Sequence, residues 1–314
     1  MTAFLITLGL LLVTALTVAL VGPSFIDWNG YRALIEAEAG RLAGRPVKID
    51  GDLRVRALPQ PRVRAGDVSI FASDDARAMV TAQSVDLHLD LGALVLGNIE
   101  ISELSLTAPQ LQVGPLLAGI SSFGERERAP ARPGILRQIE ASNATLVFDN
   151  PFGEGTLTAS DVDLQVTAST LTGPYKVTGN YGPGGEGVER PSFTASVGAI
   201  DHGGPVKVAG RIGLDVGDAS FDGAIDNLAL TPRYEGRLKI ERQFASAGEG
   251  TGGRIAIEAA AELSSGLADL ADIKLTAAEG AQALTLTGAG RVNFDGPPRF
   301  AADLKARQID LDET

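Results

Sequence analysis

Hydrophobic positions along the chain change their spacing twice, and each change predicts a different element. An uncharged run, AFLITLGLLLVTALTVALV (Ala3–Val21), comes first. A helix rises about 1.5 Å per residue, so this run would span roughly 28 Å, close to the hydrocarbon core of a bilayer. After the helix-breaking Gly22-Pro23, helical spacing predicts a short helix from about Asn29 to Leu42. From Val47 onward apolar and polar residues alternate, which is typical of strands.

The first apolar run favours a retained transmembrane anchor over the alternative, a cleaved signal peptide. No Lys or Arg precedes it, it is longer than the usual apolar part of a signal peptide, and no clear A-x-A cleavage site follows it. Charge alone leaves its orientation open. The arginine-rich flank favours the cytoplasm by the positive-inside rule, but long folded domains are translocated largely regardless of charge.

The predicted helix carries one apolar stripe, formed by Tyr31, Leu34, Ile35, Ala39 and Leu42. Glu38 interrupts this stripe, so either the face is imperfect or Glu38 pairs with Arg41 or Arg45. The rings of Trp28 and Tyr31 have two interpretations, residence among lipid headgroups or ordinary core packing.

Strict alternation after Val47 predicts antiparallel strands with one apolar and one polar face. It is cleanest in SVDLHLDL and the strand after it, where the apolar positions are Val85, Leu87, Leu89, Ile99 and Ile101. The GALVLG stretch between these two strands is too short for a stable helix and is interpreted as a turn or one helical turn. Residues 114–134 lack a period and are predicted to be a linker or mobile loop. Short strands with frequent turn signals then predict an extended all-β region over residues 135–314.

Composition and charge narrow the function classes. Apolar residues make up 44% of the 314 residues, enough for a core, while aromatic residues are only 5% and the 38 glycines fit many tight turns. The net charge of −12 argues against nucleic acid as a partner, because phosphate binding requires a basic surface. It also argues against simple electrostatic docking on an anionic bilayer.

Candidate chemistry is sparse. The chain has no cysteine and two histidines, His88 and His202, which removes thiolate chemistry and leaves little for imidazole. The D-x-H-x-D pattern around His88 could suggest a metal, but a solvated strand face is favoured since no further His or Cys supports a site. Gly288–Gly290 has no following helix to make a dinucleotide fingerprint. Asp310 and Asp312 alone do not make a glycosidase. We therefore expect no catalytic residue, metal or cofactor, and no enzyme.

The amino-terminal third resembles the AsmA family. The resemblance rests on Y-R-x-x-I-E at Tyr31–Glu36, G-R-P-V-x-I-x-G-x-L-R-V at Gly44–Val55 and I-x-E-L-x-L-x-x-P-x-L at Ile101–Leu111, in this order after an apolar segment. One departure is the lack of a charged residue before that segment. The resemblance is looser afterwards, at D-x-x-L-x-x-x-x-L-x-G-P (Asp163–Pro174). The final ARQIDLDET resembles a unit that normally continues, which predicts a fragment or a truncated relative.

A long sheet that is apolar on one face must cover that face or curl around it, and a curled sheet makes a trough suited to acyl chains. The resemblance implies the same design: a single-pass inner-membrane anchor (residues 1–26), a helix with the start of a sheet (27–113) and a periplasmic groove (135–314). It implies phospholipid transport toward the outer membrane and its maintenance. We expect Val85, Leu87, Leu89, Ile99 and Ile101 to line the groove and contact phospholipid acyl chains.

The alternative is a sealed sheet without lipid cargo. Such a protein would be an assembly or scaffold factor in outer-membrane protein biogenesis, and its partner would be an outer-membrane or envelope protein. Few aromatics and many alanines leave less bulk to fill a closed core, which favours the groove.

Overall fold

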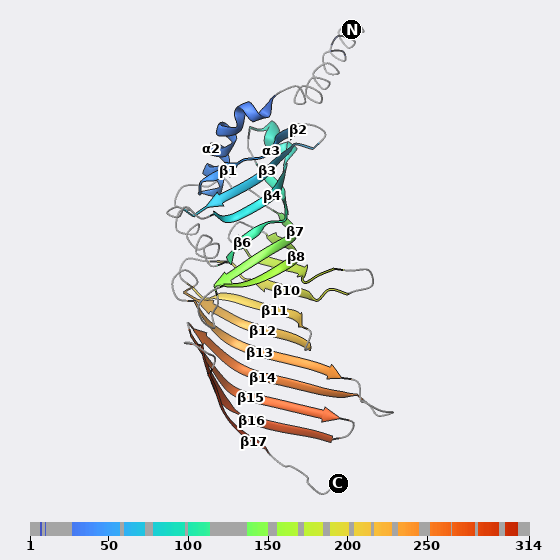
Figure 1. Ribbon diagram of the computed structural model, residues 1–314, viewed down its shortest axis with the longest axis vertical. Helices are drawn as coiled ribbons and strands as arrows, with labels where there is room; N and C mark the ends of the chain where they lie inside the picture. The colour runs from blue at the N-terminus through green and yellow to red at the C-terminus, as the bar shows by residue number, and fades with distance from the viewer. Residues whose placement is uncertain are drawn as a thin grey trace.

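The computed structural model describes residues 27–56, 60–72, 78–97, 100–113, 137–149, 156–168, 173–184, 189–200, 204–214, 217–227, 232–244, 252–264, 266–279, 282–294 and 299–306, with Thr7 and Leu10. Over these ranges the protein is one long sheet of 17 strands with little helix (Figure 1). The prediction of an all-β body with a short helix is confirmed. The described part contains no helix long and apolar enough to cross a membrane. The predicted anchor lies outside it, apart from Thr7 and Leu10.

The elements follow the chain in the order η2 (Trp28–Tyr31), α2 (Arg32–Ala43), β1 (Val47–Ile49), β2 (Leu53–Arg56), β3 (Arg62–Phe71), β4 (Ala78–Leu89), α3 (Leu91–Val95), β5 (Ile101–Thr107), β6 (Gln110–Gln112), β7 (Gln138–Asp149), β8 (Thr156–Ala168), β9 (Tyr175–Asn180), β10 (Ser192–Val197), β11 (Val206–Leu214), β12 (Gly217–Asp226), β13 (Arg233–Phe244), β14 (Gly253–Ser264), β15 (Leu267–Glu279), β16 (Gln282–Asn293) and β17 (Arg299–Ala306).

Near the amino-terminal end of the sheet, two strand positions are each occupied by two short strands with an interruption between them. β1 and β2 both pair with β3 and together form its first edge, and β5 and β6 both pair with β4. The second interruption falls at Ala108 and Pro109, where Ala108 has a φ of 47°. There the amide of Ala108 donates to Ser142 and the amide of Thr145 donates to Pro109, both at 2.8 Å. Backbone hydrogen bonding therefore crosses the interruption without a break.

One junction departs from the predicted antiparallel pairing. β7 runs parallel to β5 and β6, whereas the other pairings in the described ranges are antiparallel and β7 to β17 follow in chain order. The sheet is therefore mixed, and the wholly antiparallel prediction is wrong here. A parallel neighbour requires a connection of about a dozen residues or more, and β6 ends at Gln112 while β7 begins at Gln138. The predicted linker, residues 114–134, falls in this connection and lies outside the described residues.

The helix α2 is fixed to the first edge by a few specific contacts. Arg32 Nη2 donates to the carbonyl of Gly51 at 2.9 Å, and the amide of Ile49 donates to Glu36 Oε1 at 2.7 Å. Trp28 and Ile35 pack against a core of Ile49, Leu53, Ala65 and Val68. These contacts assign structural roles to residues of the Y-R-x-x-I-E and following motifs.

The apolar stripe predicted for this helix is not one buried face. Ile35 points to the sheet, whereas Tyr31, Leu34 and Leu42 are exposed. The reason is the small size of the surface beneath: α2 lies on the three-residue strand β1, which cannot cover a stripe three turns long. Of the two interpretations given for the Trp28 ring, the structure shows core packing, because Trp28 lies against the core beneath the helix. Glu38 accepts from Arg41 Nε at 3.0 Å, one of the two expected pairs.

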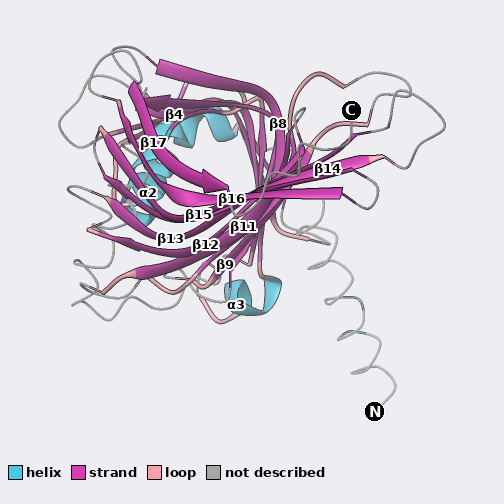
Figure 2. Ribbon diagram, turned by 90° about the horizontal axis from the view of Figure 1, so that it is seen from below, coloured by secondary structure: helices cyan, strands magenta, loops and turns pink. Residues whose placement is uncertain are grey.

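The sheet curls about the long axis of the molecule. Figure 2, seen along that axis, shows the strands curving around one side, with α2 projecting within the curve and α3 outside it. Because α2 packs on the face that carries Leu53 and Ala65, that face is the concave one.

Candidate functional site

The strand register joins apolar residues into a row that crosses the sheet from β2 to β17. Register partners share a face, so the row can be followed strand by strand. We call it the first apolar row: Leu53, Ala65, Val85, Leu106, Ala141, Leu164, Gly179, Phe193, Ile212, Ala219, Ile240, Ile257, Leu275, Leu286 and Ala306.

The row beside it, on the opposite face, contains no apolar residue. Its members are Arg54, Arg64, Asp86, Ser105, Glu140, Gln165, Thr178, Thr194, Arg211, Ser220, Lys239, Glu258, Lys274, Thr287 and Lys305. The two faces of the sheet are therefore separated by polarity along its whole length. The concave face is apolar and the convex face is polar.

The first apolar row is buried at one end of the sheet and open at the other. Leu53 is 3% exposed beneath α2 and Ala141 is 3% exposed in a second small core, whereas Ile240 is 42% and Ile257 36% exposed. Over the described ranges no helix lies above β13 to β17 (Figure 1). An apolar surface left open in this way marks an interaction site.

Four of the five residues predicted to line a groove, Val85, Leu87, Leu89 and Ile101, fall on this apolar face. Val85 packs against the core beneath α2. Leu87 lies between Val63 and Leu104, and Leu89 pairs with Ile101. These described side chains are half-buried, and Ile99 lies outside the described residues. Their contact with lipid stays a prediction.

Sequence reasoning did not single out the more open positions, Ile240, Ile257 and Leu284. The signal that could have found them is the same alternation in segments such as GRLKIERQF and QALTLTG. Their exposure could not be inferred from alternation, because it depends on where α2 lies.

The D-x-H-x-D residues of β4 each take a different partner. Asp86 accepts from Arg62 Nε at 2.6 Å and from Arg64 Nη2 at 2.7 Å, and the Asp86 side chain is 11% exposed. His88 Nδ1 lies 3.0 Å from Glu103 Oε2. Asp90 caps α3, accepting from the amide of Ala93 at 2.9 Å. The pattern thus forms ion pairs and a helix cap.

The Arg62 guanidinium, with a second contribution from Arg64, holds the pKa of Asp86 below its usual value despite the opposing effect of burial. Asp86 is consequently a carboxylate at neutral pH. It joins β3 and β4 on the convex face as a structural ion pair.

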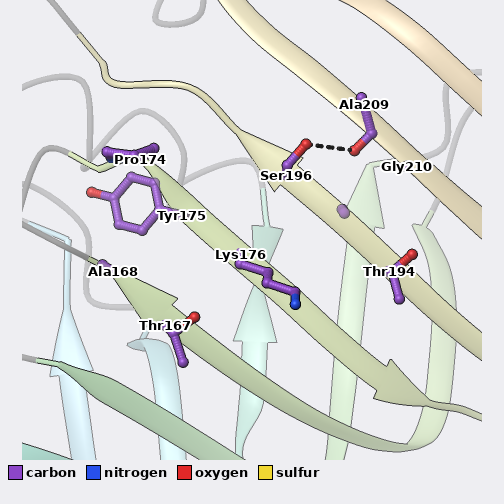
Figure 3. A pocket seen from close by; sticks show the side chains of 10 residues that line it. Thr167, Ala168, Pro174, Tyr175, Lys176, Thr194, Ser196, Ala209 and Gly210 are labelled. Carbon is purple, nitrogen blue, oxygen red and sulfur yellow. Dashed lines mark hydrogen bonds between the residues drawn. The ribbon is translucent and has the colours of Figure 1, made fainter.

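A shallow pocket lies over β8 to β11 (Figure 3). Thr167, Lys176, Thr194 and Ser196 line it, and Ser196 Oγ donates to the carbonyl of Ala209 at 3.3 Å. Register places these four residues on the polar face. The pocket offers hydroxyls and an amine suited to hydrogen bonding.

The AsmA family model matches residues 1–125, which include α2 and the strands β1 to β6. No curated protein and no solved structure matches the chain.

Proposed function

Because the amino-terminal region of this chain, residues 1–125, is an AsmA-family region, we propose that the protein shields lipid acyl chains along its concave apolar face. It would do so as an inner-membrane-anchored periplasmic protein, in phospholipid transport toward the outer membrane and its maintenance. The anchor would be the apolar run Ala3–Val21. This role requires binding and no catalytic step.

The observation that carries the proposal is the unbroken first apolar row together with its open end. Neighbouring strands are about 4.8 Å apart, so an acyl chain lying along the row would meet a new apolar side chain at each such step. Each CH₂ group removed from water contributes roughly 0.8 kcal/mol of favourable free energy. Covering one acyl chain along the row would therefore give a substantial binding free energy. The polar convex face keeps the same strands compatible with water.

The closed amino-terminal end fits this role. Leu53 and Ala65 belong to the same row as Ile240, but α2 and Trp28 cover them. The helix would therefore act as a plug between the bilayer and the open part of the groove.

Site-specific photocrosslinking in the full chain tests the proposal. A benzophenone amino acid at Ile240 or Leu286 is expected to form adducts with phospholipids, identified by mass spectrometry. Thr287, the next residue on the same strand, points to the convex face and serves as the matched control. Lipid adducts that are absent, or equal at Leu286 and Thr287, would contradict the proposal. Adducts with an outer-membrane or envelope protein instead would favour the assembly-factor alternative.

A further inference from the structure

The tip of the β4–β5 hairpin is an exposed apolar knob. It consists of α3 and the residue after it, in the uncharged stretch LGALVLG. Val95 is 78% and Leu96 80% exposed, and Leu91 and Leu94 are exposed as well, whereas Ala93 is buried. The knob has a defined shape, since Asp90 caps it through the amide of Ala93 and the amide of Leu94 donates to the Asp90 carbonyl at 3.0 Å.

Four arginines gather near this knob, two on each of two paired strands. The register sets Arg54 opposite Arg64 and Arg56 opposite Arg62 on the convex face. Like charges directly opposite each other across a sheet are destabilising. Asp86 compensates Arg62 and Arg64.

The positive charges of the outer pair, Arg54 and Arg56, are balanced much less by nearby carboxylates. Arg54 lies 3.6 Å from Asp52, and both side chains are largely exposed. In the described ranges Arg56 forms no ion pair. Arg54 and Arg56 therefore present two cations on the edge strand.

The knob and the arginines belong to one end of the molecule. Arg62 of β3 pairs with His88 of β4 in the register, and the amide of Leu89 donates to the carbonyl of Pro61 at 2.9 Å. The helix α3, which follows β4, therefore starts beside the end of β3 that also pairs with β2. Figure 1 shows α3 and β2 at the same end, and Figure 2 shows α3 on the outside of the curve, away from α2. Of the nearby acids, Asp90 caps α3, Glu103 contacts His88, and Glu100 lies at the base of the knob, where its carbonyl accepts from the amide of Asp90 at 2.8 Å.

We infer that α3 with Arg54 and Arg56 is a second membrane contact, in which Val95 and Leu96 enter the headgroup region of an anionic bilayer and the two arginines contact its phosphates. Peripheral membrane binding that is stable generally needs two signals, an apolar insertion and a basic patch, and this end of the sheet supplies both. The net charge of −12 would repel such a surface elsewhere, so the local arginines decide which part approaches it. This inference does not rest on lipid binding in the groove.

The absence of cysteine allows a direct test in the full chain. Val95→Cys carrying an environment-sensitive fluorophore is reconstituted in vesicles of phosphatidylcholine alone or mixed with phosphatidylglycerol. We expect blue-shifted emission, quenched by bilayer-embedded nitroxide lipids, in the mixed vesicles. An Arg54→Gln/Arg56→Gln variant should lower the ratio of inserted to free label by on the order of fivefold for each arginine. Ala301→Cys, on the convex face of β17, is the control that should remain in water.

Three results would count against the inference. A Val95 label that stays in water in both kinds of vesicle, or behaves like the Ala301 label, overturns it. Equal insertion with and without phosphatidylglycerol overturns the role of the arginines. Emission that shifts only when envelope proteins are added shows a protein partner in place of the bilayer. Unchanged melting of the Gln variant by circular dichroism confirms that its effect is not unfolding.

Discussion

Gly51, in the interruption between β1 and β2, lies directly against the backbone of Gly66 in β3. The amide of Gly51 donates to the carbonyl oxygen of Gly66 at 3.0 Å, and the amide of Gly66 donates to Asp52 at the same distance. A Cβ on Gly51 would lie 2.6 Å from the Gly66 carbonyl carbon. The second glycine of the G-R-P-V-x-I-x-G-x-L-R-V motif, Gly51, is therefore required because two backbones approach closely at this point. The same residue accepts a hydrogen bond from Arg32 through its carbonyl.

Gly51→Ala is expected to destabilise the amino-terminal end by about 1–3 kcal/mol, because backbone must shift to admit the methyl group. Thermal unfolding followed by circular dichroism measures the loss. Gly66→Ala is the matched control: its Cβ would meet its nearest atom at 3.4 Å, an ordinary contact, and its effect should be clearly smaller. Equal losses for the two variants would show that the close approach is not the cause.

A charge placed in the first apolar row should lower the free energy of unfolding far more at the covered end of the row than at its open end. Leu53→Asp places a carboxylate in the core beneath α2 and should cost several kcal/mol or prevent folding. Ile257→Asp, at an open position, should cost about 1 kcal/mol or less while reducing the phospholipid recovered with the protein. Melting curves and lipid mass spectrometry check the two effects. Unfolding by Ile257→Asp would argue that this part of the row is sealed.

The half-buried Leu87 and Leu89 provide a test of the lining first predicted from alternation. If these residues contact lipid, Leu87→Asp and Leu89→Asp, made one at a time, should leave the protein folded and weaken acyl-chain binding, because the charge reaches water at the open side. Loss of folding, in a protein that carries no lipid in its natural form, would favour the sealed sheet and the scaffold alternative.

The Asp86 ion pairs predict a defined pH dependence. The pKa of Asp86 is lower in the folded protein than its usual value near 3.8, so its stabilising effect is complete above that value and is lost as pH falls through the folded pKa. Asp86→Asn should lower the stability at neutral pH by about 1–2 kcal/mol, since Arg62 and Arg64 lose their shared acceptor. The difference from the natural protein should narrow below about pH 4. A difference that is constant from neutral pH to pH 3 would contradict this account.

The proposed topology makes a prediction in cells. Reporter domains fused after Val113 are expected to be active when they require the periplasm and inactive when they require the cytoplasm. The same chain should remain in the membrane fraction after alkaline extraction if Ala3–Val21 is retained as an anchor. Activity of a cytoplasm-dependent reporter would overturn the orientation, and release of the chain would indicate cleavage.

The spacing of apolar residues and the residues that end helices and form turns made much of this fold predictable from the sequence. Alternation from Val47 predicted the strands and which residues share a face, because side chains of a strand alternate with a period of two whatever lies against them. Helical spacing ending at Gly44 likewise predicted α2, and Gly44 adopts the left-handed φ of 63° that ends the helix.

Only the tertiary structure decided what each face meets. The parallel junction at β7, the meeting of Arg56 with Arg62 and the backbone contact of Gly51 with Gly66 depend on register between strands. Register is set by pairing between segments distant in sequence and is invisible in the period of any one strand. The same holds for Leu53 and Ile257, which look alike in the sequence: one is covered and the other open because α2 packs at one end of a sheet too long for it to cover.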